Sequence, residues 1–159
     1  MKRTQDLKAQ YQLQMDEEGV LLAAATILER RLQRQGRIHS PEQAASYLVA
    51  RCAHLSHEIF GVVFLDTKHH ILATEHLFSG TVDGCEVHSR VVAKRALELN
   101  AVALVLFHNH PSGNPEPSEA DRKVTERLKQ ALALLDIRVL DHLVIGGQKH
   151  TSLAARGWA

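Results

Sequence analysis

The sequence predicts an α/β domain with a mixed β-sheet flanked by helices. Some segments carry apolar residues at helical spacing, and other, shorter segments are rich in β-branched and aromatic residues. The two kinds of segment follow one another in the order α-α-β-β-α-β-α-β-β. This order is typical of one sheet that helices cover, rather than of an all-helical or all-β fold.

Two helices are predicted before the first strand. A helix is predicted over residues 16–35, because their apolar side chains form one stripe at helical spacing. The stripe consists of Val20, Leu21, Ala24, Ile27, Leu28 and Leu32. Gly36 is expected to end this helix. Ser40 and Pro41 then mark a helix start, because serine caps the first turn and proline fits the first helical position. We expect the second helix to run to about His54.

The strands occupy the rest of the chain. Residues 58–66 and 70–78 are separated by turn residues and predict an antiparallel hairpin. Residues 101–107 are almost continuously apolar, which is typical of a central strand buried on both faces. A loop is expected over residues 80–84. The predicted order is completed by helices over residues 87–99 and 118–135 and by strands over residues 136–145 and 148–153.

Size and composition fit one soluble domain with a short extension. The chain has 159 residues, of which 45% are hydrophobic and 23% charged, and its net charge is +1. This charge gives no global attraction to nucleic acid. Two cysteines are too few for a disulfide scaffold. Without a signal-peptide pattern or an apolar run near the ~20 residues that cross a bilayer, we expect a cytoplasmic protein with no membrane partner.

The segment from His108 to Asp121 carries the strongest functional signal. His108 and His110 are two residues apart at the end of the apolar run, so on a strand both imidazoles point to one side while Asn109 points away. A loop restricted by prolines then turns the chain back and delivers Asp121. Two imidazoles and one carboxylate can bind a zinc ion and leave a fourth position open, which is the arrangement of a catalytic site.

Each of these residues also has an ordinary structural interpretation. Ser118 and Asp121 have the spacing of a capping box at a helix start. His108 and His110 alone would more often be core or surface histidines. Glu58 opens the first strand and is the best candidate for a general base, although alone it is ordinary strand-edge charge. That all of these residues occur together at these spacings favours a metal site over a chance arrangement of structural residues.

The spacing His-x-His, seven residues, Ser, two residues, Asp resembles the JAMM motif of the MPN+ family of zinc metalloproteases. More closely, residues 108–113, Pro117, Ser118 and Asp121, together with residues 136–146, look like the bacterial RadC family. The resemblance covers about residues 55–157. It implies a cytidine-deaminase-like three-layer sandwich, with residues 1–55 as a helical N-terminal extension and residues 56–159 as the RadC-like JAB/MPN+ domain.

The resemblance also implies residue roles. His108, His110 and Asp121 would bind Zn²⁺, Glu58 would activate the zinc-bound water, and Ser118 would donate a hydrogen bond to the oxyanion of the tetrahedral intermediate. The implied activity is hydrolysis of a peptide or isopeptide bond, with a protein or peptide as substrate. The "DNA repair" label of the family is carried here only as an inherited name.

Two other functions stay open on the sequence. A DNA-associated accessory protein with non-catalytic zinc would use basic residues such as Arg30, Arg31, Arg34 and Arg37, but the first 55 residues show no Gly-rich helix-hairpin-helix. An MPN-type interaction scaffold is disfavoured because all the site residues are retained. Cys85 is interpreted as a free thiol rather than a nucleophile. Asp141-His142 is either a pair that supports the metal site or a satisfied structural pair.

Overall fold

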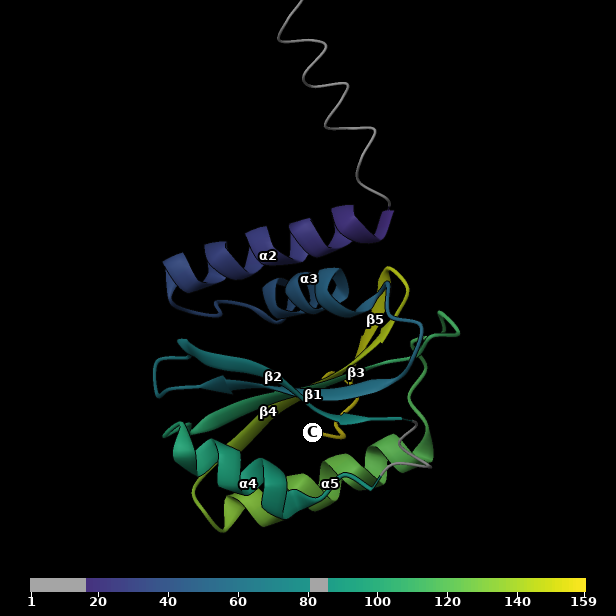
Figure 1. The fold of residues 1–159 in the computed structure, drawn as a ribbon. Coiled ribbons are helices and arrows are strands. Elements are labelled where there is room, and N and C mark those ends of the chain that lie inside the picture. The colour runs from purple at the N-terminus through teal and green to yellow at the C-terminus, as the bar shows by residue number, and fades with distance from the viewer. Residues whose placement is uncertain (1–16, 81–85) are drawn as a thin grey trace, which may run out of the picture.

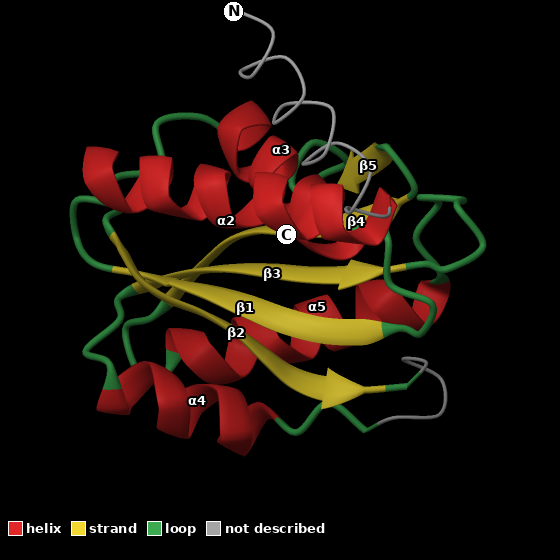
Figure 2. Cartoon of the chain, turned by 45° about the horizontal axis from the view of Figure 1, so that its top comes forward, coloured by secondary structure: helices red, strands yellow, loops and turns green. Residues whose placement is uncertain are grey.

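The computed structural model describes residues 17–80 and 86–159, with the backbone alone given for residues 31–35. One β-sheet lies between two helical layers, with α2 and α3 on one face and α4 and α5 on the other (Figures 1 and 2). The predicted α/β architecture, a mixed sheet flanked by helices, is therefore confirmed. Residues 1–16, most of the predicted loop over residues 80–84, and Cys85 lie outside the described residues.

The elements follow the predicted order. The described helices are α2 (Glu17–Gln35), α3 (Pro41–Cys52), α4 (Ser89–Glu98) and α5 (Glu119–Ala133). The described strands are β1 (Ile59–Leu65), β2 (Ile71–Ser79), β3 (Ala103–Asn109), β4 (Arg138–Gly146) and β5 (Lys149–Ser152). Gly36 ends α2 with a φ of 66°, a left-handed conformation that glycine adopts without steric cost. The helix-stop prediction at this position is thus correct.

In the described residues the strand order is β2-β1-β3-β4-β5. β3 pairs with β4 in parallel, and the other neighbours pair antiparallel. As predicted, β3 is central, and all seven of its residues are buried. It continues beyond the apolar run through His108 and Asn109, because β1 pairs with it as far as His108 and β4 as far as Asn109. The first histidine therefore sits on regular strand backbone.

Alternation along β3 divides the core into two halves. Val105 and Phe107 belong to the cluster that packs under α3, whereas Leu104 and Leu106 belong to the cluster on the side of α4 and α5. Gly61 of β1 makes room for the first cluster, since a Cβ atom there would lie 2.2 Å from the Phe107 ring. α3 thus contributes side chains directly to the core, while the division of the chain at residue 55 stays a prediction.

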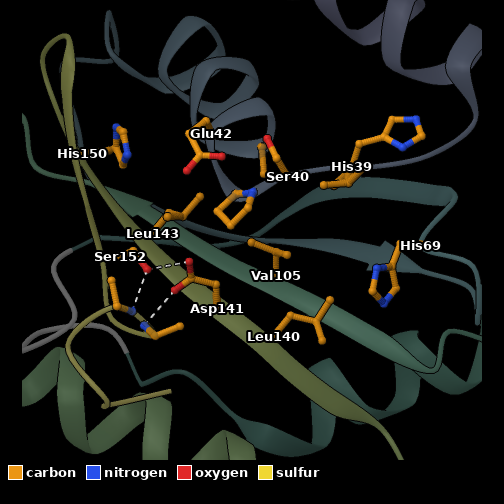
Figure 3. Close-up of a pocket in the computed structure, with 15 residues that line it drawn as sticks. His39, Ser40, Glu42, His69, Val105, Leu140, Asp141, Leu143, His150 and Ser152 are labelled. Atoms are coloured by element: carbon orange, nitrogen blue, oxygen red, sulfur yellow. Dashed lines mark hydrogen bonds between the residues drawn. The ribbon is translucent and has the colours of Figure 1, made fainter.

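A cavity of about 550 Å³ lies on the α3 face of the sheet, beside the start of α3 and strands β4 and β5 (Figure 3). Its floor includes Val105 and Leu143, and its polar wall includes Asp141. The Asp141 carboxylate accepts hydrogen bonds from the Ser152 hydroxyl and the Ala154 N–H, at 2.7 and 3.0 Å. Because Val105 faces α3, this cavity opens on the opposite side of the sheet from His108.

None of the described helices combines the length and the apolar character that crossing a membrane requires.

The pKa of the Cys52 thiol is raised to about 12, mainly because α3 buries it completely against the sheet. The thiolate is the reactive form, so native Cys52 is expected to resist alkylation and disulfide exchange near neutral pH. In a Cys85→Ala variant, Ellman's reagent should label no thiol in native buffer and one thiol per chain in concentrated guanidinium chloride. Rapid labelling of the folded variant would contradict this burial.

Candidate metal centre

The two histidines of the motif meet at the C-terminal end of β3. His108 is fully buried, and the His110 side chain is 19% exposed. Their Nε2 atoms lie 3.0 Å apart. The His108 ring also lies nearly parallel to the ring of Phe60, its partner residue on β1, with centroids 6.5 Å apart. Both imidazoles therefore present the same ring nitrogen to one point, as the i, i+2 spacing predicts.

The loop over residues 110–118 connects β3 to α5 (Figure 1). Backbone contacts hold it against the end of β4. The His110 N–H donates to the Ile145 carbonyl at 2.7 Å. At Gly146 a Cβ atom would lie 2.5 Å from the backbone nitrogen of Pro115, so only glycine allows the loop to come this close. A second contact comes from the C-terminal segment, where Arg156 makes a bidentate ion pair with Glu116 at 2.6 and 2.7 Å.

Asp121 enters the cluster from the first turn of α5. Its Oδ1 lies 3.2 Å from Nε2 of His108, and its Oδ2 lies 3.8 Å from Nε2 of His110. The predicted capping box is also present, because the Ser118 hydroxyl accepts from the Asp121 N–H while Oδ2 of Asp121 accepts from the Ser118 N–H. Capping thus fixes the rotation of the carboxylate.

Two opposing effects act on the Asp121 carboxyl. Burial raises its pKa, but the adjacent His108 ring and the hydrogen bond from the Ser118 N–H more than offset this, so the pKa lies well below its usual range. The carboxylate is therefore ionised at neutral pH and available as an oxygen ligand.

Glu58 completes the cluster from the residue before β1. One of its carboxylate oxygens and one ring nitrogen from each of His108 and His110 all lie within 4.8 Å of one another. Asn109, between the two histidines, fixes the backbone on both sides of Glu58. Its Oδ1 accepts from the Ile59 N–H at 2.8 Å, and its Nδ2 donates to the His57 carbonyl at 3.0 Å. As predicted, Asn109 faces away from the imidazole pair.

The donor spacing fits a tetrahedral metal ion. Ligands that bind zinc at 2.0–2.1 Å with tetrahedral angles lie about 3.3 Å from one another. Nε2 of His108 lies 3.0 Å from Nε2 of His110 and 3.2 Å from Oδ1 of Asp121, both close to this value, and the other Asp121 oxygen, Oδ2, lies 3.8 Å from Nε2 of His110. Two neutral nitrogens and one carboxylate also match the donor preferences of zinc. Within residues 17–80 and 86–159, Glu58, His108 and His110 also carry donor atoms close enough together to hold an ion.

The structure brings Glu58, His108, His110, Ser118 and Asp121 to one place, from β3, α5 and the start of β1. Their individual roles stay predictions. The side chains of Asp141 and His142 point to opposite faces of the sheet, because alternation sends Asp141 to the cavity on the α3 face and His142 toward His108. The Asp141 carboxylate accepts from the His142 N–H at 2.7 Å, but only the His142 ring lies at the candidate centre.

Sequence reasoning missed Thr125 and left open whether His142 supports the site. Both residues are completely buried next to the cluster. Thr125 follows Asp121 by one helical turn, so the i, i+4 spacing places both on one face of α5 and could have pointed to it. Nothing in the sequence indicates that the ring of His142 would contact the ring of His108, which lies 34 residues earlier in the chain.

We predict that Asn109→Ala lowers the free energy of unfolding by about 1–3 kcal/mol, because it leaves the buried Ile59 N–H without its acceptor. Urea denaturation followed by circular dichroism measures the change. Gln130→Ala on the exposed face of α5 is the control and should change the free energy by less than about 0.5 kcal/mol. Equal stabilities of the two variants would show that Asn109 does not hold the end of β1.

Comparison with known proteins identifies the family of this chain. A family model described as the RadC-like JAB domain matches residues 38–158. Relatives named UPF0758 protein include one from Stutzerimonas stutzeri, 52% identical over 141 residues, which cover 89% of this chain and 63% of the relative. Another, from Vibrio cholerae, is 51% identical over 142 residues that cover 89% of both chains.

A relative from Xanthomonas campestris is 53% identical over 127 residues, or 80% of this chain and 56% of the relative. The chain thus spans a little under two thirds of the length of several relatives, but most of the length of the Vibrio protein. The family match covers the whole sheet, α3, α4, α5 and every predicted site residue. The chain belongs to the family of RadC-like JAB domains.

Proposed function

We propose that this protein is a zinc-dependent hydrolase that cleaves a peptide or isopeptide bond. The observation that carries the proposal is the convergence of His108, His110 and Asp121, at spacings suited to one tetrahedral ion, with Glu58 beside them. Three protein ligands leave the fourth position of a tetrahedral ion open, which distinguishes a catalytic zinc site from a structural one. Zinc bound there would polarise a carbonyl group and lower the pKa of a coordinated water toward ~7.

Glu58 is assigned the role of general base. Its carboxylate lies within 4.8 Å of the histidine nitrogens, which is near enough to take a proton from a water at the open position. The Asn109 side chain and the hydrogen bond from Gly80 N–H to the Glu58 carbonyl, at 2.9 Å, hold its backbone. A base held in this way would pass the proton on to the leaving amine.

Ser118 is assigned the role of oxyanion donor, and capping does not compete with it. In the capping box the hydroxyl oxygen accepts from the Asp121 N–H, at 3.1 Å. A hydroxyl can accept through its lone pairs while its own proton is donated elsewhere. The Ser118 side chain thus retains a donor for a negatively charged oxygen that develops during carbonyl addition.

The combination of a Lewis acid, a base and an oxyanion donor suits addition of water to a carbonyl group, as in amide hydrolysis. The partner we propose is therefore a protein or peptide with a susceptible amide bond. DNA binding with a non-catalytic metal predicts a different result, namely inert protein that binds DNA with a steep salt dependence.

Glu58→Gln is expected to bind zinc with near wild-type stoichiometry and to lose 10²–10⁴-fold in kcat, because it removes the base. Metal content by atomic emission and cleavage of fluorogenic peptide and isopeptide libraries measure the two properties. Glu126→Gln, on the exposed side of α5, is the control and should keep both. Wild-type protein that holds zinc but cleaves nothing, or equal turnover by Glu58→Gln, would overturn the hydrolase proposal.

Ser118→Gly should lower kcat about 10²–10³-fold, since the oxyanion donor is lost. Glycine is tolerated at a helix N-cap, so the free energy of unfolding should fall by only a few tenths of a kcal/mol. Ser118→Thr keeps both the cap and the hydroxyl and should retain most activity. Steady-state kinetics on zinc-loaded protein separates the two variants, and equal rates would exclude Ser118 from the reaction.

A further inference from the structure

A continuous line of hydrogen bonds joins two of the site residues through two side chains that have no assigned role. The Thr125 Oγ1 lies 2.7 Å from the Asp121 carbonyl oxygen and 2.5 Å from Nδ1 of His142. Nε2 of His142 lies 2.8 Å from Nδ1 of His108. The line therefore runs from α5 to β4 to β3 and ends on the ring whose other nitrogen faces Asp121.

The chemistry of these groups fixes the direction of every bond in the line. A carbonyl oxygen only accepts, so Thr125 donates its single hydroxyl proton to Asp121. The contact with His142 must then be one in which Thr125 accepts, which requires a proton on Nδ1 of His142. A neutral imidazole with a proton on Nδ1 has a lone pair on Nε2. That lone pair accepts the Nδ1 proton of His108.

His142 has the surroundings of a neutral ring. Its relative exposure is 0%, and the edge of the Phe60 ring packs against it with centroids 5.5 Å apart. Burial among apolar and aromatic groups disfavours a second ring proton. The hydroxyl of Thr125 and the ring of His108 take up both of its nitrogens.

We infer that Thr125 and His142 are positioning residues that hold His108 in the tautomer with its proton on Nδ1, so that Nε2 presents a lone pair to a metal ion. The inference rests on the proposed metal-dependent function. It extends that function because it gives a reason for two buried polar residues that are not themselves proposed ligands. Without the Thr125 hydroxyl, the Nδ1 proton of His142 loses its acceptor, and the reversed tautomer would direct a proton toward His108.

Thr125→Val and Thr125→Ser form a matched pair for the test. Valine keeps the shape and removes the hydroxyl, whereas serine keeps the hydroxyl. Competition with a chromophoric chelator is expected to give a zinc dissociation constant 10–100-fold weaker for Thr125→Val than for wild type, and within about threefold of wild type for Thr125→Ser. Equal affinities of the two variants would overturn the inference.

Ring tautomers provide a second readout that does not depend on turnover. Long-range ¹H–¹⁵N correlation spectra of zinc-loaded wild-type protein should show His142 protonated on Nδ1 and unprotonated on Nε2. The opposite tautomer would overturn the inference even if Thr125→Val does not fold. His142→Gln, which keeps an acceptor for His108, should bind zinc more tightly than His142→Leu, and the reverse order would count against the assignment.

These outcomes separate the inference from the proposed function. If wild type binds zinc with the assigned tautomer but cleaves no amide, the positioning role stands and the hydrolase proposal fails. If wild type cleaves amides while Thr125→Val and Thr125→Ser bind zinc equally well, the hydrolase proposal stands and the positioning role fails.

Discussion

The pairing of β3 with both β1 and β4 is the constraint on which the rest of the structure depends. The register sets Phe60 opposite His108 on one side and places Leu106 beside His142 on the other. With β3 buried on both faces, a shift of one residue would move the imidazoles to the α3 face and the apolar side chains out of their clusters. The position of the candidate metal centre is thus determined by the packing of the core.

Four buried polar residues next to the candidate metal centre are tolerated because each one has a partner. His108, Asp121, Thr125 and His142 are all almost completely buried, and each makes at least one hydrogen bond to another member of the group. A buried polar group without a partner would cost about 1–3 kcal/mol. The network therefore holds the metal-facing atoms in place without leaving unsatisfied groups, which is how a rigid scaffold orients ligands before an ion binds.

The loop between β3 and α5 shows how residues outside the centre shape it. Gly146 allows the loop to lie against β4, and the ion pair between Glu116 and Arg156 ties it to the C-terminal segment. The guanidinium groups of Arg122 and Arg156 lie 5.0 and 5.6 Å from the centre of the Trp158 ring. These contacts fix the path from His110 to Asp121, so a short loop with three prolines becomes a defined connection between two residues of the candidate metal centre.

The sequence by itself determined the elements and the local chemistry. Hydrophobic periodicity located the helices and the central strand, and the spacing of His108, His110, Ser118 and Asp121 indicated both the capping box and a candidate metal centre, because those relations span only a few residues. Tertiary structure decided the contacts that cross between strands and helices. Asn109 reaches Ile59 over 50 residues, and His142 reaches His108 over 34. Such contacts depend on strand register and on the face to which each residue points, and these are settled only when the whole sheet is packed.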